Sequence, residues 1–352
     1  MRFDTMVLSG VTHAFSDDIA IDLGTANTLV HVVGRGVIID EPSVVAVLAR
    51  GPSRDVLAVG LRAKAMQVHK PPEPVEVIRP MRDGVIADFI ATEEMLRQFI
   101  ARAKSMLGFR RPRILICVPA GATPVERRAV YETALSAGAR RVHLIEEPVA
   151  AALGAGLPVD GSQAFMVVDV GGGTTDIAVL AEGRVLQART LRVAGNAMDQ
   201  AIVRHVRRRH RLLIGETAAE RIKIEAGTAL AAPNGRQIEI HIKGRDLGDG
   251  RLKSVVLTPV DMVEALALPV AQMAEFVRRA LEDLPPDAAA DATARDIVLT
   301  GGGALLDRLD VALRASVGAI FKVPDTPTHC VIKGCAAVLQ SLDRRQHLLV
   351  GP

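Results

Sequence analysis

A short acidic motif with a glycine-rich turn occurs twice in this chain, and this repeat constrains the fold more than any other feature. Alternating apolar residues run from Ile19 to Leu23, meet a turn at Gly24 and resume from Leu29 to Val33. Further along, the apolar stretch 165–168 leads through Asp169 into a run of glycine and threonine and out into more apolar residues. Each copy has the pattern of two strands joined by a tight turn.

The two hairpins align at one constant offset of 147 residues (169 − 22). The aligned pairs are Asp22 with Asp169, Gly24 with Gly171, Asn27 with Thr174, and Thr28 with Thr175. Since a domain takes about 150 residues, the 352-residue chain has room for two. The repeat therefore predicts an internal duplication, with two similar α/β domains whose hairpins face each other across a cleft. Two unrelated hairpins are the alternative.

The segments around the hairpins have the patterns of alternating strands and helices. Thr123 and Glu126 form a capping box that predicts a helix to about Ala137, and Thr92 is the expected cap of an earlier helix. The other expected elements are strands at 113–118, 142–145 and 297–300, a helix opening at 147–148 and an amphipathic helix at 304–313.

Clusters of proline and glycine interrupt each half after its hairpin, so we expect each domain to carry a small subdomain. The expected parts are an N-terminal extension at 1–16, a first large subdomain at 17–36, 77–150 and 326–352, a first small subdomain at 37–76, a second large subdomain at 151–188 and 255–325, and a second small subdomain at 189–254.

Composition excludes several classes of protein. Hydrophobic residues make up 49% and charged residues 24% of the chain, which argues against disorder and against a disulfide scaffold. The three cysteines form no C-x-x-C pair, which fits a reducing cytosol. An aromatic content of 3% and a net charge of +3 argue against nucleic acid as a partner. No apolar run reaches the 18 or so residues of a membrane span, so we expect a protein that is neither secreted nor membrane-spanning.

The turns of the two hairpins are candidate phosphate-binding loops, because a glycine- and threonine-rich turn can aim several backbone N–H groups at one anion. The candidate residues are Gly24, Thr25, Ala26 and Asn27 in the first turn, and Gly171, Gly172, Gly173, Thr174 and Thr175 in the second. Asp22 and Asp169 are the candidate ligands of a shared Mg²⁺, held through the metal's own waters. An ordinary tight hairpin is the alternative for each turn.

A third glycine turn follows the strand expected at 297–300. This turn is Gly301 to Gly303, and Thr300 together with the helix start behind it suits a nucleotide. A simple strand-to-helix turn is the alternative. The three turns together are more specific than any one of them.

Motifs spread over nearly the whole chain resemble those of the MreB family of bacterial actins. They are IDLGTANT at 21–28, EPSVV at 41–45, IRPMRDGVIAD at 78–88, VERRA at 125–129, LIEEP at 144–148, VDVGGGTT at 168–175, AERIKIE at 219–225 and LTGGGALL at 299–306. The resemblance implies an actin-like fold of two duplicated α/β domains with four subdomains, and ATP with Mg²⁺ in the central cleft.

The resemblance also implies roles for particular residues. Glu147 would orient the water that attacks the terminal phosphate, although a capping role at a helix start is its alternative. Glu220 and Lys223 would contact the ribose and adenine, and Thr217 to Glu220 also reads as a capping box. The remaining adenosine-binding residues would be Gly301, Gly302, Gly303 and Ala304.

The function that the resemblance implies is a weak ATPase that assembles with itself into filaments. These filaments would lie on the inner face of the cytoplasmic membrane and scaffold cell-wall elongation proteins to set rod shape. Ala197 and Gln200 replace acidic residues common in the family, and five arginines lie between 204 and 211. These departures bear on filament contacts or partners, and a solvated helix face is the plainer interpretation of the arginines.

An apolar segment beside arginines is a candidate membrane contact. Met106, Leu107 and Phe109 precede Arg110 and Arg111, and buried apolar side chains with neighbouring cations favour an anionic lipid surface. Packing of these residues in the core is the alternative. The N-terminal segment 1–16 has a fainter amphipathic stripe.

Two other functions within the same superfamily compete with the filament hypothesis. A monomeric phosphotransferase resembling a sugar kinase would need larger insertions for a substrate pocket and a catalytic base. An ATP-driven chaperone would need an added peptide-binding domain. The sequence leaves the choice between ATP and GTP, the filament geometry and the hydrolysis rate open.

Overall fold

A computed structural model of the chain describes residues 18–48, 55–68, 74–105, 111–231 and 238–352. The chain divides into two compact units. Unit 1 comprises Met1–Val159, Gly183–Val185 and His329–Pro352, and unit 2 comprises Asp160–Glu182 and Leu186–Thr328. The N-terminal extension at 1–16 and the candidate membrane residues Met106, Leu107 and Phe109 lie outside the described residues.

Unit 1 contains a six-stranded sheet in the order β19-β10-β9-β1-β2-β3. Its strands are β1 (Ile19–Leu23), β2 (Asn27–Val32), β3 (Gly36–Pro42), β9 (Arg113–Val118), β10 (Arg141–Glu146) and β19 (Leu349–Val350). β1 pairs antiparallel with β2 and parallel with β9, and β9 pairs parallel with β10. Strand β1 therefore lies at the centre of the sheet and carries Asp22 out to its carboxyl end.

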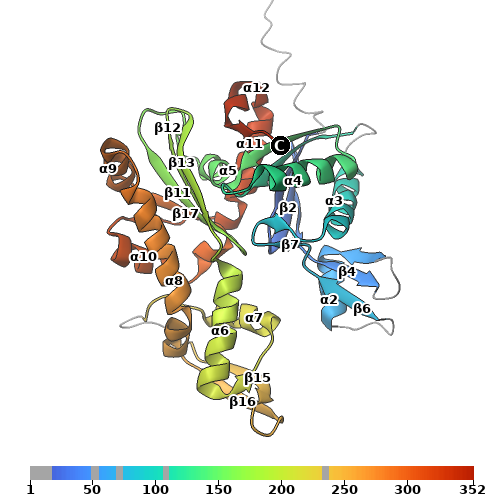
Figure 1. Ribbon diagram of the computed structural model, residues 1–352, viewed down its shortest axis with the longest axis vertical. Coiled ribbons are helices and arrows are strands. Elements are labelled where there is room, and N and C mark those ends of the chain that lie inside the picture. Colours follow the sequence, from blue (N-terminus) through green and yellow to red (C-terminus); the bar gives the residue numbers. More distant parts are fainter. Residues whose placement is uncertain (1–17, 49–54, 69–73, 106–110, 232–237) are drawn as a thin grey trace, which may run out of the picture. The chain divides into compact units, whose positions relative to one another are not determined.

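Unit 1 also contains helices and two smaller sheets (Figure 1). The helices are α2 (Gly60–Val68), α3 (Phe89–Lys104), α4 (Pro124–Ser136), α5 (Glu147–Gly154), α11 (Cys330–Gln340) and α12 (Leu342–Arg345), with a 3₁₀ turn η4 (Gln346–Leu348). A small sheet holds β4 (Val45–Leu48), β5 (Val56–Val59) and β6 (Val75–Ile78), and β7 (Met81–Arg82) pairs with β8 (Val85–Ile86).

Unit 2 contains a five-stranded sheet in the order β13-β12-β11-β17-β18. Its strands are β11 (Phe165–Val170), β12 (Thr175–Ala181), β13 (Arg184–Leu191), β17 (Ile297–Thr300) and β18 (Phe321–Lys322). A separate sheet holds β14 (Leu212–Leu213), β15 (Ile240–Asp246) and β16 (Leu252–Leu257). The helices are α6 (Gly195–His210), α7 (Glu216–Ala226), α8 (Pro259–Glu282), α9 (Pro286–Ala294) and α10 (Leu309–Val317), with 3₁₀ turns η2 (Gly302–Leu305) and η3 (Pro327–His329).

The strand pairing confirms the internal duplication. Strands β10-β9-β1-β2-β3 of unit 1 have the order of β18-β17-β11-β12-β13 in unit 2. Asp22 pairs with Leu29 across the first hairpin, and Asp169 pairs with Asp176 across the second. Both partners are displaced by the same 147 residues (169 − 22 and 176 − 29). The two hairpins therefore share their register as well as their sequence pattern.

Each unit has its own apolar core. The unit 1 core packs the inner faces of β1, β2, β9 and β10 against α3, where Met95, Leu96 and Phe99 are fully buried. The unit 2 core packs its sheet against α6, α7, α8 and α10. Aliphatic and alanine side chains supply most of both cores, as expected from a chain with 3% aromatic residues. In the part of the chain that the structure describes, no helix is long and apolar enough to span a membrane.

Three local predictions are wrong. Helix α3 begins at Phe89 with Asp88 as its cap, and Thr92 lies inside the helix, where its hydroxyl donates to the Asp88 carbonyl. Helix α7 begins at Glu216 after Gly215, without a side-chain cap, so the capping box ending at Glu220 does not form. The helix expected at 304–313 is divided into η2 and α10.

The break between η2 and α10 has a backbone cause. Arg308 adopts a left-handed conformation with φ of 60°, which a continuous right-handed helix does not allow. The apolar periodicity of this segment comes from two short elements that both face the unit 2 core, through Ala304, Leu309 and Leu313.

Candidate functional site

The first half-site, in unit 1, joins three side chains at strand and helix ends. Asp22 lies near the carboxyl end of β1, Cys117 near that of β9, and Glu147 opens α5. One ligand atom of each lies within 4.8 Å of those of the other two. The thiol of Cys117 donates to Asp22 Oδ1 at 3.2 Å. Parallel strands end at one edge of a sheet, which brings these residues together although they are far apart in sequence.

Burial controls the charges of this half-site. It raises the pKa of Asp22 to about 6, against the lowering effect of the Cys117 hydrogen bond, and the charge of Asp40 adds to the rise. Burial also raises the pKa of the Cys117 thiol well above its usual value, as do Cys335 and the charges of Asp22 and Glu147. Cys117 is thus a neutral donor, and Asp22 is a carboxylate that a nearby cation would stabilise.

The turn at Gly24–Asn27 is held by Ser43, which follows β3. The Ser43 hydroxyl donates to the Gly24 carbonyl at 2.6 Å, and the Ser43 N–H donates to the Ala26 carbonyl at 2.9 Å. The Thr25 hydroxyl, buried, accepts from the Gly84 N–H at 3.0 Å. These bonds fix the backbone of the turn, which is the condition for its N–H groups to present a shaped site to an anion.

The second half-site, in unit 2, is built around Asp169 at the end of β11. The Thr300 hydroxyl donates to Asp169 Oδ1 at 2.8 Å, and both residues are buried. Gly301 follows with φ of 82°, a conformation that favours glycine. A Cβ at Gly301 would lie 2.7 Å from Asp169 Oδ1 and still closer to the Val170 carbonyl oxygen. Only glycine therefore fits where the third turn passes the carboxylate.

The glycine turn of unit 2 packs against the start of α6. Within the turn, the Gly171 N–H donates to the Thr174 carbonyl at 2.9 Å. At its outer side, the Gly195 N–H donates to the Gly171 carbonyl at 3.1 Å, and the Asn196 N–H donates to the Gly172 carbonyl at 2.7 Å. The N-terminal end of a 16-residue helix therefore abuts the turn, and the helix dipole adds positive potential there.

Lys223 of α7 contacts the start of α6 beside this turn. Its ammonium group donates to the Gly195 carbonyl at 3.0 Å and pairs with Asp199 at 2.8 Å, with both side chains largely buried. An ammonium group has three donors, so these two bonds set the direction of the third. Glu220 lies one helical turn before Lys223 on α7 and is half-buried.

The structure brings the predicted residues together in two groups. Asp22 and Glu147 meet in unit 1. Asp169 meets Gly301, and the Gly171 turn meets the Gly195 start of α6, which Lys223 contacts. The sequence analysis assigned no role to three residues that hold these groups in place: Ser43, Cys117 and Asp199. Thr300 was singled out beside the third glycine turn, and Cys117 lies at the corresponding place on β9, which neighbours β1 as β17 neighbours β11.

The duplicated sheets and their paired carboxylate turns define an actin-like α/β fold. The solved structure of MreB5 of Spiroplasma citri bound to ADP superimposes with a TM-score of 0.86 and 32% identity, covering 93% of this chain and 97% of that one. A structure of the same Spiroplasma protein bound to AMPPNP has the same TM-score, with 31% identity.

Sequence comparison defines the family. The family model described as "MreB/Mbl protein" matches residues 16–347. The cell shape-determining protein MreB of Escherichia coli K12 is 47% identical over 332 residues, which cover 94% of this chain and 95% of the relative. The corresponding protein of Pasteurella multocida is 45% identical over 341 residues, covering 96% and 97%. This chain belongs to the MreB/Mbl family, and the comparisons favour a cell-shape function over the sugar-kinase alternative.

Proposed function

We propose that this protein binds ATP with Mg²⁺, assembles into filaments with its own kind and thereby determines cell shape. The observation that carries the proposal is the pair of half-sites, each with a strand-end aspartate beside a glycine turn at the same register. The comparisons support the proposal in two ways. Relatives at 45–47% identity are named cell shape-determining proteins, and structures of a related protein were solved with ADP and with AMPPNP bound.

The residues present fit a magnesium nucleotide. Mg²⁺ prefers oxygen ligands and keeps several of its waters, so one or two carboxylates suffice to hold it. Asp22, whose buried position raises its pKa to about 6, gains most from such a cation. We assign Asp22 and Asp169 to the metal, and the turns 24–27 and 171–175 to the phosphates. The bound cation would supply positive charge to neutralise the phosphate oxygens during transfer.

The adenosine end of the nucleotide is assigned to unit 2. Gly301, Gly302, Gly303 and Ala304 form the turn beside Asp169, and Gly301 leaves space that any side chain would fill. Lys223 and Glu220 contribute from α7. Because Asp199 and Gly195 already hold the Lys223 ammonium group, its remaining donor is positioned in advance for a ribose or base oxygen.

Glu147 is the proposed catalytic residue of a weak ATPase. Its side chain reaches the Asp22 carboxylate from the first residue of α5. A carboxylate at this position can orient a water in line with the terminal phosphate and take up its proton. Hydrolysis coupled to assembly would let filaments form with ATP and disassemble after phosphate release.

The same proposal includes partners and a location. We infer filaments at the inner face of the cytoplasmic membrane, in contact with cell-wall elongation proteins. The membrane contact would use Met106, Leu107 and Phe109. Apolar side chains can each contribute up to about 1.5–3 kcal/mol on burial, and a filament multiplies weak contacts by avidity.

Sedimentation and electron microscopy with and without ATP and Mg²⁺ test the proposal. We expect filaments that depend on both. The double variant Asp22→Asn/Asp169→Asn should lose nucleotide-dependent assembly, whereas Asp249→Asn, at an exposed loop of unit 2, should assemble like the wild type. A protein that stays monomeric at all nucleotide concentrations, yet transfers phosphate to a metabolite, would favour the sugar-kinase alternative instead.

A further inference from the structure

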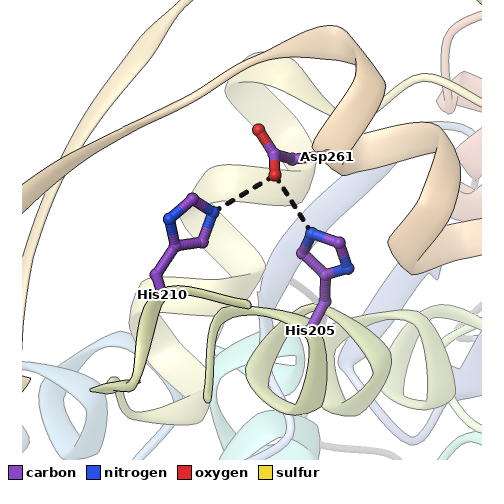
Figure 2. A group of neighbouring side chains, drawn as sticks. All are labelled: His205, His210 and Asp261. Atoms are coloured by element: carbon purple, nitrogen blue, oxygen red, sulfur yellow. Dashed lines mark hydrogen bonds and ion pairs between the residues drawn. The ribbon is translucent and has the colours of Figure 1, made fainter. Parts of the chain in front are cut away.

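A second cluster of potential metal ligands, His205, His210 and Asp261, lies in unit 2 (Figure 2). It lies at the end of α6 opposite Gly195, which contacts the glycine turn. His205 and His210 belong to the last turns of α6, and Asp261 belongs to the first turn of α8. Both imidazole Nε2 atoms lie 3.2 Å from the same oxygen, Asp261 Oδ1. Figure 2 shows the two rings converging on that one oxygen from neighbouring positions.

We propose that His205, His210 and Asp261 bind one divalent transition metal ion, with Zn²⁺ as the best match. Two imidazoles and one carboxylate form a donor set that zinc uses when three protein groups leave a fourth position for water. The three ligand atoms already lie within 4.8 Å of one another, so small side-chain rotations would complete the site. Mg²⁺ and Ca²⁺ suit it poorly because they prefer oxygen ligands.

The distances suit this coordination as well as they suit hydrogen bonds. Zinc–nitrogen and zinc–oxygen bonds are about 2.0–2.2 Å long, so adjacent ligand atoms of a tetrahedral site lie about 3.3–3.5 Å apart. Both Nε2 to Oδ1 distances are 3.2 Å, close to that separation. A direct N–H to oxygen hydrogen bond most often spans about 2.9–3.0 Å, and 3.2 Å is the upper end of its range.

The carboxylate is held in place for this role. Asp261 Oδ2 accepts from the Thr258 N–H at 2.9 Å and from the Thr258 hydroxyl at 2.7 Å, which leaves Oδ1 directed at the two rings. Burial would raise the pKa of Asp261, but the bonds from Thr258 and from the two imidazoles outweigh it and hold the pKa well below its usual range. Groups that orient a ligating carboxylate in this way strengthen metal binding.

The cluster is sheltered but reachable. The side chain of His205 is 2% exposed, that of Asp261 13%, and that of His210 20%. An ion can therefore enter on the His210 side, where a water would complete the coordination. The C-terminal end of α6 also favours a positive charge, which offsets part of the repulsion from the exposed arginines at 204, 207, 208, 209 and 211.

This site is separate from the proposed nucleotide site. His210 ends the 16-residue helix that Gly195 begins, and a helix of that length spans about 24 Å. The metal would tie the end of α6 to the start of α8, two helices that pack along each other (Figure 1). Its expected effect is on the stability of unit 2, and it does not depend on nucleotide binding.

Zinc titration of the full chain, freed of metal with a chelator that is then removed, tests the site. Competition with a chromophoric zinc indicator measures affinity, and Co²⁺ substitution reports the geometry by its visible absorption bands. The key variant is His210→Gln, which alters a partly exposed ligand and is expected to fold. His241→Gln is the matched control, because His241 is an exposed histidine on β15 of the same unit.

We expect the wild type and His241→Gln to bind zinc equally, and His210→Gln to bind it at least tenfold more weakly and to lose the tetrahedral Co²⁺ spectrum. Zinc should also raise the unfolding temperature of the wild type but not that of His210→Gln. Equal zinc affinity and equal Co²⁺ spectra in the wild type and His210→Gln would overturn the proposal. The zinc would then be bound elsewhere, for example at Asp22, Cys117 and Glu147, a site that does not involve His210. Absence of zinc binding by the wild type at micromolar concentrations would overturn it as well.

Discussion

The two half-sites share one scaffold but differ in the group that faces the strand-end aspartate. In unit 1 a cysteine thiol donates to Asp22 Oδ1 at 3.2 Å, and in unit 2 a threonine hydroxyl donates to Asp169 Oδ1 at 2.8 Å. A thiol is a weak donor and a hydroxyl a good one. Duplication therefore kept the position of each carboxylate and varied how strongly its charge is supported.

The charged groups around the two aspartates also differ. Unit 1 adds a second acid, Glu147, beside Asp22. Unit 2 adds the N-terminal end of α6, held against the glycine turn with the help of Lys223. The first half-site concentrates negative charge that needs a cation, and the second presents positive potential that suits an anion. Under the proposed function, the first half-site would therefore carry the hydrolytic residue, and the second would contribute more of the positive potential that holds the phosphates.

The prediction with the largest expected effect tests whether hydrolysis and nucleotide binding depend on different residues. Glu147→Gln should slow phosphate release at least about 100-fold, since a positioned acid or base contributes about 10²–10⁴-fold to a rate. Nucleotide affinity should change by no more than about threefold, because the phosphate-binding turns are intact. Single-turnover phosphate release and nucleotide titration measure the two quantities.

The control for this variant is Glu132→Gln, on the exposed face of α4 in the same unit. It should match the wild type in both measurements. If Glu147→Gln released phosphate at the wild-type rate, the assignment of hydrolysis to unit 1 would be wrong.

The second prediction concerns how much the buried charge of Asp22 lowers the free energy of unfolding. In protein free of nucleotide and metal, Asp22→Asn should increase the free energy of unfolding at pH 8 by up to about 3 kcal/mol, because the pKa of Asp22 is raised to about 6. The same variant should weaken Mg²⁺-nucleotide binding, so its two effects have opposite signs. Urea unfolding and nucleotide titration, each with and without Mg²⁺, measure them.

The sign of the pH dependence follows from linkage. The folded state holds the Asp22 proton up to about pH 6, whereas the unfolded state releases it near pH 4. This group's contribution to stability is therefore full at low pH and is lost as the pH rises from about 4 to 6. Asp22→Asn should remove that loss, so its stabilising effect should vanish at pH 4. A gain in stability of equal size at pH 4 and pH 8 would show that the buried charge of Asp22 is not its cause.

Much of this comparison could be predicted from sequence, since the hairpin pattern around Asp22 and Asp169 identified the duplication, its constant offset of 147 residues and the glycine turns. The starts of α4 and α5 were also correct, because capping and proline signals are local. The cap of α3 was wrong because Thr92 and Asp88 both suit a helix start, and tertiary structure decides which one begins it. Cys117 was missed because its contact with Asp22 arises from strand order, which no local pattern encodes.

The third prediction compares two glycines of unit 2 with nearly equal backbone conformations. Gly301 has φ of 82° and Gly318 has φ of 81°, but a Cβ at Gly301 would meet Asp169 and Val170, whereas one at Gly318 would meet nothing within 4 Å. Gly318→Ala should cost about 1–2 kcal/mol for backbone strain alone. Gly301→Ala should cost at least about 2 kcal/mol more, because the turn must move away from the carboxylate.

Thermal or urea unfolding of the two alanine variants measures the difference, and nucleotide titration shows whether the turn has moved. Gly318→Ala should bind nucleotide like the wild type, and Gly301→Ala should bind it more weakly. Equal destabilisation by the two variants would mean that the approach of the third turn to Asp169 is looser than the structure shows.

The smallest expected effect tests the difference between the two donors directly. Cys117→Ser replaces the thiol with a hydroxyl of similar size, giving Asp22 the kind of donor that Asp169 has in Thr300. A stronger hydrogen bond to the ionised carboxylate should stabilise metal-free protein at pH 8 by about 1 kcal/mol and should reduce the loss of stability between pH 4 and pH 6. The reverse exchange, Thr300→Cys, is the matched variant in unit 2 and should destabilise by a similar amount. Unfolding midpoints across this pH range decide the matter. If Cys117→Ser leaves the pH dependence unchanged, burial and the charge of Asp40 set the pKa of Asp22, and the identity of the donor does not explain why the two half-sites differ.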